Sequence, residues 1–149
     1  MVYPFGAYAI AVEVERETGE TRILKFAAVD DGGRIINPLL AEGQVIGAIA
    51  QGLGQALAEE IVYDEAGQLV TGTFSDYAMP HAAQAPTVAA EFTETLSPYN
   101  PLGAKGVGEA GTVGAPAALA NAVMDALRPL GIKNVDPPFW AEKLWALIG

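Results

Sequence analysis

The sequence predicts an α+β fold, with a mixed or antiparallel sheet of about five strands and packed helices, in a single domain over residues 1–149. Some segments place an apolar residue at every second position, which is typical of half-buried strands. Others space apolar residues three or four positions apart, which is typical of helices that bury one face. With 149 residues, 51% of them hydrophobic, the chain can bury one core but is short for two.

The expected strands lie in the first third and in the middle of the chain. They occupy residues 7–16, 21–29, 61–64, 68–74 and 87–95. In the first strand, Glu13 and Glu15 alternate with apolar side chains, as at the surface of a half-buried sheet. Gly19 supplies a turn after the first strand, and Gly67 supplies a turn after the third. Two hairpins and one further strand are therefore expected.

Three helices are expected between and after these strands. The first begins at Asn37-Pro38, where a polar cap precedes a proline, and continues to about residue 59. The second runs from near Pro116 to Leu127 and is followed by Gly131. The third covers about residues 140–148. Each carries an apolar stripe that can pack on the sheet.

The first expected helix is unusually rich in glycine. Its glycines are Gly43, Gly47, Gly52 and Gly54. Each interior glycine costs a helix about 1 kcal/mol relative to alanine, so something must need a close approach to this backbone. Residues 43, 47 and 51 share one face. Gln51 is then either a solvated side chain beside tight helix packing, or a carboxamide that contacts a large ligand.

Residues 103–111 form a second glycine-rich segment, with Lys105 and Glu109 as its charged residues. It is either an ordinary turn with Glu109 in solvent, or an anion-binding nest of backbone N–H groups with Lys105 nearby. In the second case Glu109, in apolar surroundings, is suited to act as a general base. The spacing Gly106-x-Gly108-x-x-Gly111 matches a dinucleotide fingerprint, but residues 97–101 contain two prolines where that fingerprint needs a strand. NAD binding is therefore not expected.

Charge and composition exclude several classes of function. The formal net charge is −10 without a basic cluster, so a nucleic-acid partner is not expected. The chain has no cysteine and one histidine, His81, so it cannot build a zinc or iron–sulfur site from its own residues. Any metal would arrive with a cofactor. No secretion signal and no membrane-spanning run is recognised, and we expect a cytoplasmic protein.

Several separated segments together carry a resemblance to a known family. They are residues 29–38, 42–44, 51–57 and 100–114. In this order they resemble the C-terminal part of the molybdenum-binding large subunit of the xanthine oxidase and aldehyde oxidase family. Within this family, the sequences of these segments are most similar to large chains of the carbon monoxide dehydrogenase type. The similarity extends over essentially the whole chain, from Tyr3 to Trp145.

This resemblance implies roles for particular residues. Glu109 corresponds to the glutamate beside the molybdenum, which acts as a general base. The cofactor would be molybdopterin cytosine dinucleotide, with iron–sulfur clusters and FAD on partner subunits. The residues implied to bind it are Gln51, Gly52, Lys105, Gly106, Val107 and Gly108. No residue of this chain is implied to ligate the metal.

Family large subunits are several times longer than this chain, so the resemblance implies a part of a larger subunit. The expected partners are the remainder of that subunit, an iron–sulfur subunit and an FAD subunit in an oligomeric complex. The isolated chain is expected to be inactive, and its substrate is left open among CO, aldehydes and N-heterocycles. The alternative is a non-catalytic assembly or cofactor-binding module with the same fold.

Overall fold

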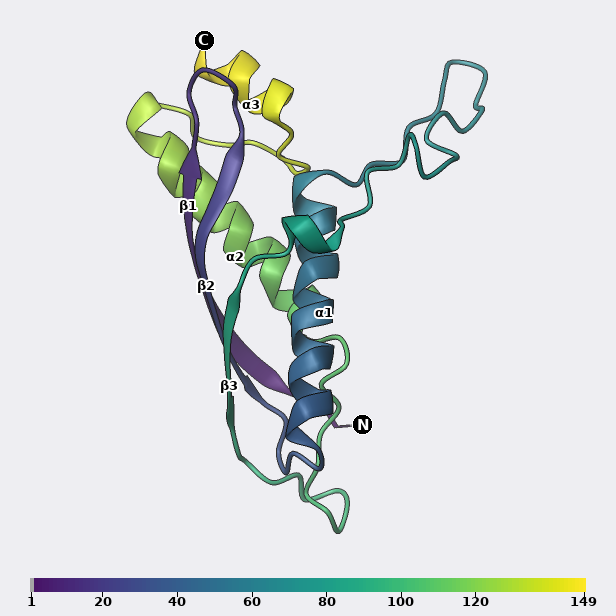
Figure 1. The fold of residues 1–149 in the computed structure, drawn as a ribbon, viewed down its shortest axis with the longest axis vertical. Helices are drawn as coiled ribbons and strands as arrows, with labels where there is room; N and C mark the ends of the chain where they lie inside the picture. Colours follow the sequence, from purple (N-terminus) through teal and green to yellow (C-terminus); the bar gives the residue numbers. More distant parts are fainter. Residues whose placement is uncertain (1) are drawn as a thin grey trace.

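The computed structural model describes residues 2–149 and shows a three-stranded sheet with two long helices packed against one face (Figure 1). A short C-terminal helix lies near the turn of the first hairpin (Figure 1). The elements are β1 (Phe5–Val14), β2 (Thr21–Asp31), α1 (Pro38–Leu57), η1 (Ala82–Gln84), β3 (Val88–Thr93), α2 (Ala110–Leu127), η2 (Arg128–Leu130) and α3 (Ala141–Ile148). The expected α+β arrangement is confirmed at this level.

The sheet has the order β1-β2-β3 and is mixed. β1 and β2 form the expected antiparallel hairpin, with Phe5 opposite Asp31 and a register shift at Ala11/Val12. β3 runs parallel to β2 and pairs Asp31 with Thr93. Because parallel strands end at the same edge of a sheet, the loops that follow β2 and β3 meet there.

The prediction of five strands is wrong, because the expected second hairpin does not form strands. Among the described residues, its two segments share a single bridge between Tyr63 and Leu69. The turn itself is present, since the Asp64 carboxylate accepts hydrogen bonds from the backbone of Ala66 and Gln68. Residues 61–70 are all exposed. A two-stranded hairpin without a covering layer is marginal in water, which explains why the ladder stays short.

This hairpin belongs to a segment that extends away from the sheet and helices, at the upper right of Figure 1. We call residues 58–81 the arm. At its base, the Tyr77 hydroxyl donates a hydrogen bond of 2.7 Å to Glu59. Residues 61–70 beyond this base are exposed, and no apolar side chain of the arm is among those packed against the core. Where the arm returns to the helices, Pro80 lies against α1, since a Cβ atom at Gly54 would be 2.6 Å from Pro80 Cδ.

The helices agree with the prediction in number, and one differs in where it begins. Asn37 caps α1 by accepting a hydrogen bond from the backbone N–H of Leu40. α2 begins at Ala110 rather than near Pro116, which lies inside the helix. A proline removes one helical hydrogen bond and normally marks an end. Here the first turn is held instead by Gly111, where a Cβ atom would lie 2.5 Å from the backbone nitrogen of Ile49 in α1.

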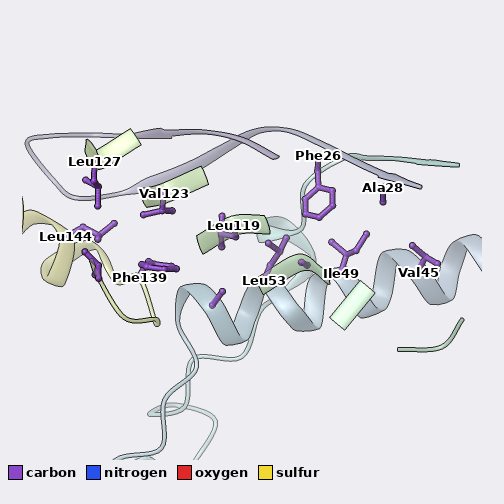
Figure 2. Close-up of a cluster of buried hydrophobic side chains, with 13 residues drawn as sticks. Phe26, Ala28, Val45, Ile49, Leu53, Leu119, Val123, Leu127, Phe139 and Leu144 are labelled. Atoms are coloured by element: carbon purple, nitrogen blue, oxygen red, sulfur yellow. The ribbon is translucent and has the colours of Figure 1, made fainter. Parts of the chain in front are cut away.

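A continuous apolar core lies between the sheet and the helices (Figure 2). Phe26 of β2 points toward α1, and Leu119 and Val123 of α2 occupy the space beside it (Figure 2). Phe139 and Leu144, the buried residue of α3, extend the core toward the C-terminal helix (Figure 2). This core fixes α1 and α2 against β2, and with them the loops at the end of the sheet.

Within residues 2–149, no helix is long and apolar enough to cross a bilayer.

Candidate functional site

Two loops join at the edge of the sheet where β2 and β3 end. Gly33 and Ala104 form an antiparallel bridge, and the Lys105 N–H donates a 2.8 Å hydrogen bond to the Gly32 carbonyl. Gly33 and Gly103 have positive φ angles of 60° and 69°. A Cβ atom at Gly33 would collide with the Gly103 carbonyl, so only glycine fits this crossing. The crossing holds residues 106–109 at the start of α2.

A buried ion pair lies beneath this crossing. The Lys105 Nζ atom is 2.8 Å from Asp31 Oδ1, and the two side chains are 9% and 1% exposed. Burial alone would raise the pKa of Asp31. The Lys105 ammonium and hydrogen bonds from the Gly33 backbone and Thr95 outweigh it and hold this pKa well below its usual range. The sequence suggests Lys105 as a cation that could bind an anionic ligand, but in the structure its ammonium is already paired with Asp31.

A cleft of about 760 Å³ opens beside the loop, between β1 and the first turns of α2. Its size is that of a small-molecule site. The residues that line it include Phe5, Tyr8, Asp30, Gly106, Glu109 and Asn121. Glu109 is the N-cap residue of α2 and is exposed. The apolar shielding expected around Glu109 is therefore not supplied by the described part of this chain.

Asp30 and Tyr8 form a hydrogen-bonded polar part of the cleft wall. The Tyr8 hydroxyl lies 2.8 and 3.0 Å from the two oxygens of Asp30. Asp30 is 2% exposed, and burial raises its pKa, although the Tyr8 hydrogen bond partly opposes this. A Cβ atom at Gly6 would collide with Asp30, and one at Gly114 would collide with the Tyr8 ring. Sequence reasoning did not single out this pair, and the unusual Asp30-Asp31 sequence at a strand end was the available signal.

The sequence left two interpretations of the α1 glycines open, namely tight helix packing and close approach of a large ligand. The structure supports the first for Gly52 and leaves space for the second at Gly43 and Gly47. Gly52 packs against α2, because a Cβ atom there would lie 2.9 Å from Pro116 Cδ. At Gly43 and Gly47 a Cβ atom would meet nothing within 4 Å. Gln51 on the same face is exposed, and its Oε1 atom lies 3.4 Å from the Thr112 hydroxyl. An open strip of backbone therefore runs along α1 toward Gln51.

The predicted site residues do not all meet in one place. Gly106, Gly108 and Glu109 line the cleft. Val107 packs partly buried against the core, and a Cβ atom at Gly32 would lie 2.7 Å from its Cγ1. The Gln44 side chain of α1 lies near the loop, since its Oε1 atom would be 3.9 Å from a Cβ atom at Gly108.

The described residues, from Val2 to Gly149, contain no group of three His, Cys, Asp or Glu side chains that could hold a metal ion.

Known proteins resemble the whole of this chain. It is 48% identical over 98% of its length to the gamma subunit of the 6-hydroxypseudooxynicotine dehydrogenase complex of Paenarthrobacter nicotinovorans. It is 40% identical over 97% of its length to the carbon monoxide dehydrogenase large chain of Afipia carboxidovorans. The chain spans 18% of the length of each of these relatives.

Solved structures agree with the sequence relatives. A Cu,Mo-CO dehydrogenase superimposes with a TM-score of 0.93 at 39% identity, over 97% of this chain and 18% of the other. Quinoline 2-oxidoreductase from Pseudomonas putida 86 gives a TM-score of 0.91 at 43% identity, over 96% of this chain and 18% of the other. The expected similarity to carbon monoxide dehydrogenase large chains over essentially the whole chain is confirmed. Its placement at their C-terminal end stays a prediction.

The family model of the molybdopterin cofactor-binding domain matches residues 1–86. These residues include both strands of the hairpin, α1 and the arm. Since the match covers more than half of the sequence, the chain belongs to the molybdopterin cofactor-binding domain family.

Proposed function

We propose that this chain is part of the catalytic subunit of a molybdenum hydroxylase, in which it helps to hold the cofactor and supplies Glu109 as the general base. One observation carries the proposal: Glu109 faces a cleft of about 760 Å³ beside Gly106 and Gly108, on a loop fixed by the fold. A positioned carboxylate at the start of a helix can accept a proton from a bound reactant.

The residues present fit a large anionic pterin cofactor. Gly43, Gly47 and Gly106 present backbone with open space where a side chain would be. Gln51 adds an exposed carboxamide that can both donate and accept hydrogen bonds. Of the residues implied to hold the cofactor, Gln51, Gly106 and Gly108 offer accessible groups, and Gly52, Lys105 and Val107 support the backbone around them. When bound, molybdopterin cytosine dinucleotide would supply the redox chemistry.

The work of this chain is then to orient and to move one proton. The crossing of the two loops fixes Ala104 and Lys105, and the backbone of residues 106–109 runs from this crossing into α2. Its N–H groups can face an anion without a side chain in the way. The Glu109 carboxylate, exposed here, would be shielded from water once the rest of the subunit covers the cleft, which favours proton acceptance from a bound reactant.

The remaining parts of the enzyme lie outside this chain. It spans 17–18% of the length of three relatives, whose names mention nicotine, carbon monoxide and 6-hydroxypseudooxynicotine. Residues outside the chain would therefore select the substrate among CO, aldehydes and N-heterocycles. We further propose a cytoplasmic complex with the rest of the large subunit, an iron–sulfur subunit and an FAD subunit. The 149 residues alone are proposed to be inactive.

The test is to purify the chain from a host that makes molybdopterin cytosine dinucleotide, with and without the rest of a related large subunit. Stoichiometric molybdenum and CMP only in the presence of that partner would support the proposal. In the loaded complex, Glu109→Gln should keep both contents and lower kcat by a factor on the order of 10²–10⁴. Glu91→Gln, an exposed carboxylate on β3, is the matched control and should keep kcat.

The second candidate is a non-catalytic cofactor-binding or assembly module. It is favoured by the exposure of Glu109 and by the small share of the relatives that the chain covers. If Glu109→Gln removes bound molybdenum and CMP, the carboxylate serves binding and the general-base role is wrong.

A further inference from the structure

Asp31 and Lys105 lie directly behind the candidate site, and neither side chain lines the cleft. We propose that this ion pair is a positioning device: Asp31 holds Lys105, and through Lys105 it holds the backbone of residues 106–109 facing the cleft. What that backbone faces rests on the proposed function. The holding of the loop rests on this chain alone.

Asp31 is anchored where two strands end. It is the last residue of β2 and lies opposite Thr93, the last residue of β3. Its Oδ2 atom accepts a hydrogen bond of 3.2 Å from the Thr93 hydroxyl, and its Oδ1 atom accepts one of 3.0 Å from the Gly33 N–H. The carboxylate is therefore fixed in the sheet before it meets the loop.

Lys105 is held from both of its ends. Its backbone N–H donates to the Gly32 carbonyl at 2.8 Å, and its ammonium lies 2.8 Å from Asp31. The ammonium also lies 4.7 Å from the centre of the Phe5 ring, on the neighbouring strand β1. Gly106 follows directly, so the glycine-rich segment after Lys105 begins at a residue whose backbone and side chain are both anchored.

Because the ion pair is buried, it holds the loop strongly. If the loop moved away, two buried charges would each lose their partner, which is much more costly than separating exposed charges. The Glu13–Arg22 pair of the hairpin provides the contrast, with 3.4 Å between its atoms and side chains that are 53% and 63% exposed. Pairs of that kind contribute little to stability.

This arrangement also changes the role expected for Lys105. To contact a phosphate, its ammonium would have to leave Asp31 buried without a counter-ion. The backbone N–H groups after Lys105, rather than its ammonium, are the donors free to face an anionic cofactor. Lys105 is thus a positioning residue that acts through the loop.

The first test is acetylation of lysine side chains by an N-hydroxysuccinimide ester in the chain without cofactor. Lys25 and Lys133, which are exposed, serve as internal references. Lys105 should react at least about tenfold more slowly than they do, and Asp31→Asn should remove most of that difference. Equal reactivity of the three lysines in the unaltered chain would overturn the proposal.

The second test measures amide hydrogen exchange across the loop. Asp31→Asn should speed exchange in residues 104–108 by about tenfold or more, while the buried turns of α1 and α2 keep their rates. The control Glu13→Gln, which neutralises the exposed pair, should change neither segment. Unchanged exchange in residues 104–108 of Asp31→Asn, or equal acceleration throughout the chain, would contradict a positioning role.

A double variant separates positioning from folding. Each single change leaves the other charge buried without a partner. Asp31→Asn combined with Lys105→Met should therefore speed exchange in residues 104–108 no more than Asp31→Asn alone. If the single variant does not fold, the double variant should fold and show fast exchange in residues 104–108. Failure of both to fold would assign the pair to folding and overturn the proposal. No cofactor is present, so a failed molybdenum or CMP analysis would reject the proposed function without affecting this result.

Discussion

The loop end of the sheet, where residues 32–34 cross residues 103–105, and the arm are built from similar residues but are held in different ways. Both contain glycine turns and exposed apolar side chains. At the loop end, Gly33 bridges Ala104 and Asp31 binds Lys105, so segments far apart in the sequence fix each other. In the arm beyond its base, the hydrogen bonds join residues within the arm itself. Order at the candidate site therefore comes from long-range contacts that the chain provides by itself.

The tight crossing of α1 and α2 supports the loop end, and adding one methyl group there should have the largest effect. A Cβ atom at Gly111 would lie 2.5 Å from Ile49 N and 2.6 Å from Val45 O, both backbone atoms that cannot move aside. We expect Gly111→Ala to lower the free energy of unfolding by about 3 kcal/mol, as for overpacking of a dense core. Urea unfolding checks this value. A loss below about 0.5 kcal/mol would show that the helices can separate without cost.

Much of the body could be predicted from the sequence because its pattern is local. Alternation in β1 and the Asn37-Pro38 cap of α1 place these elements within a few residues of where they lie. The arm could not be predicted in this way, since its alternating residues lack the covering layer that would turn alternation into strands. The start of α2 at Ala110 depends on Gly111 meeting α1, a contact that no local pattern contains.

The candidate site could be predicted only in part, for the same reason. The glycine-rich segment and Glu109 stand out in the sequence, and the structure brings Gly106, Gly108 and Glu109 to one cleft. The partners of that segment do not stand out. Asp31 is 74 residues from Lys105 in the sequence, and their pairing requires β2, β3 and both loops to be in place.

The two adjacent acids at the end of β2 should respond to pH in opposite directions. The folded chain holds the Asp30 proton more tightly than the unfolded chain, since burial raises this pKa from 3.8. Asp30 therefore lowers the free energy of unfolding as pH rises through that raised pKa. The pKa of Asp31 is lowered in the folded chain, despite burial, by the Lys105 ammonium and by hydrogen bonds. Its stabilisation is present above the unfolded pKa and is lost as pH falls through the folded one.

Urea unfolding at several values between about pH 4 and pH 7 isolates the Asp30 contribution, because the Asp31 contribution changes only below its unfolded pKa. Asp30→Asn should make stability fall less, or rise, with increasing pH across this range. Tyr8→Phe tests the same side of the cleft, because it removes the hydroxyl that donates a hydrogen bond to Asp30 and lowers the Asp30 pKa. The free energy of unfolding should then fall more steeply as pH rises. The same pH dependence in all three proteins would contradict a buried, proton-retaining Asp30.

The open glycine face of α1 should respond to a methyl group in the opposite sense to Gly111. A Cβ atom at Gly43 meets nothing within 4 Å, and alanine is the better helix former. We expect Gly43→Ala to raise the free energy of unfolding by about 0.5–1 kcal/mol in the chain alone. In the loaded complex the same methyl group would occupy the strip proposed for the cofactor and should lower CMP content. Higher stability with unchanged CMP content would remove Gly43 from the proposed binding face.

The arm should show the smallest effect of all. Phe74 is 86% exposed, so replacing it removes almost no buried area from the chain as it stands. We expect Phe74→Ser to change the free energy of unfolding by less than about 0.5 kcal/mol, as is usual for surface positions. The chain should instead become more soluble, because an exposed aromatic ring favours self-association. Light scattering of concentrated protein measures this gain. A large loss of stability would mean that the arm packs on the body, and that the two regions are held more alike than their contacts indicate.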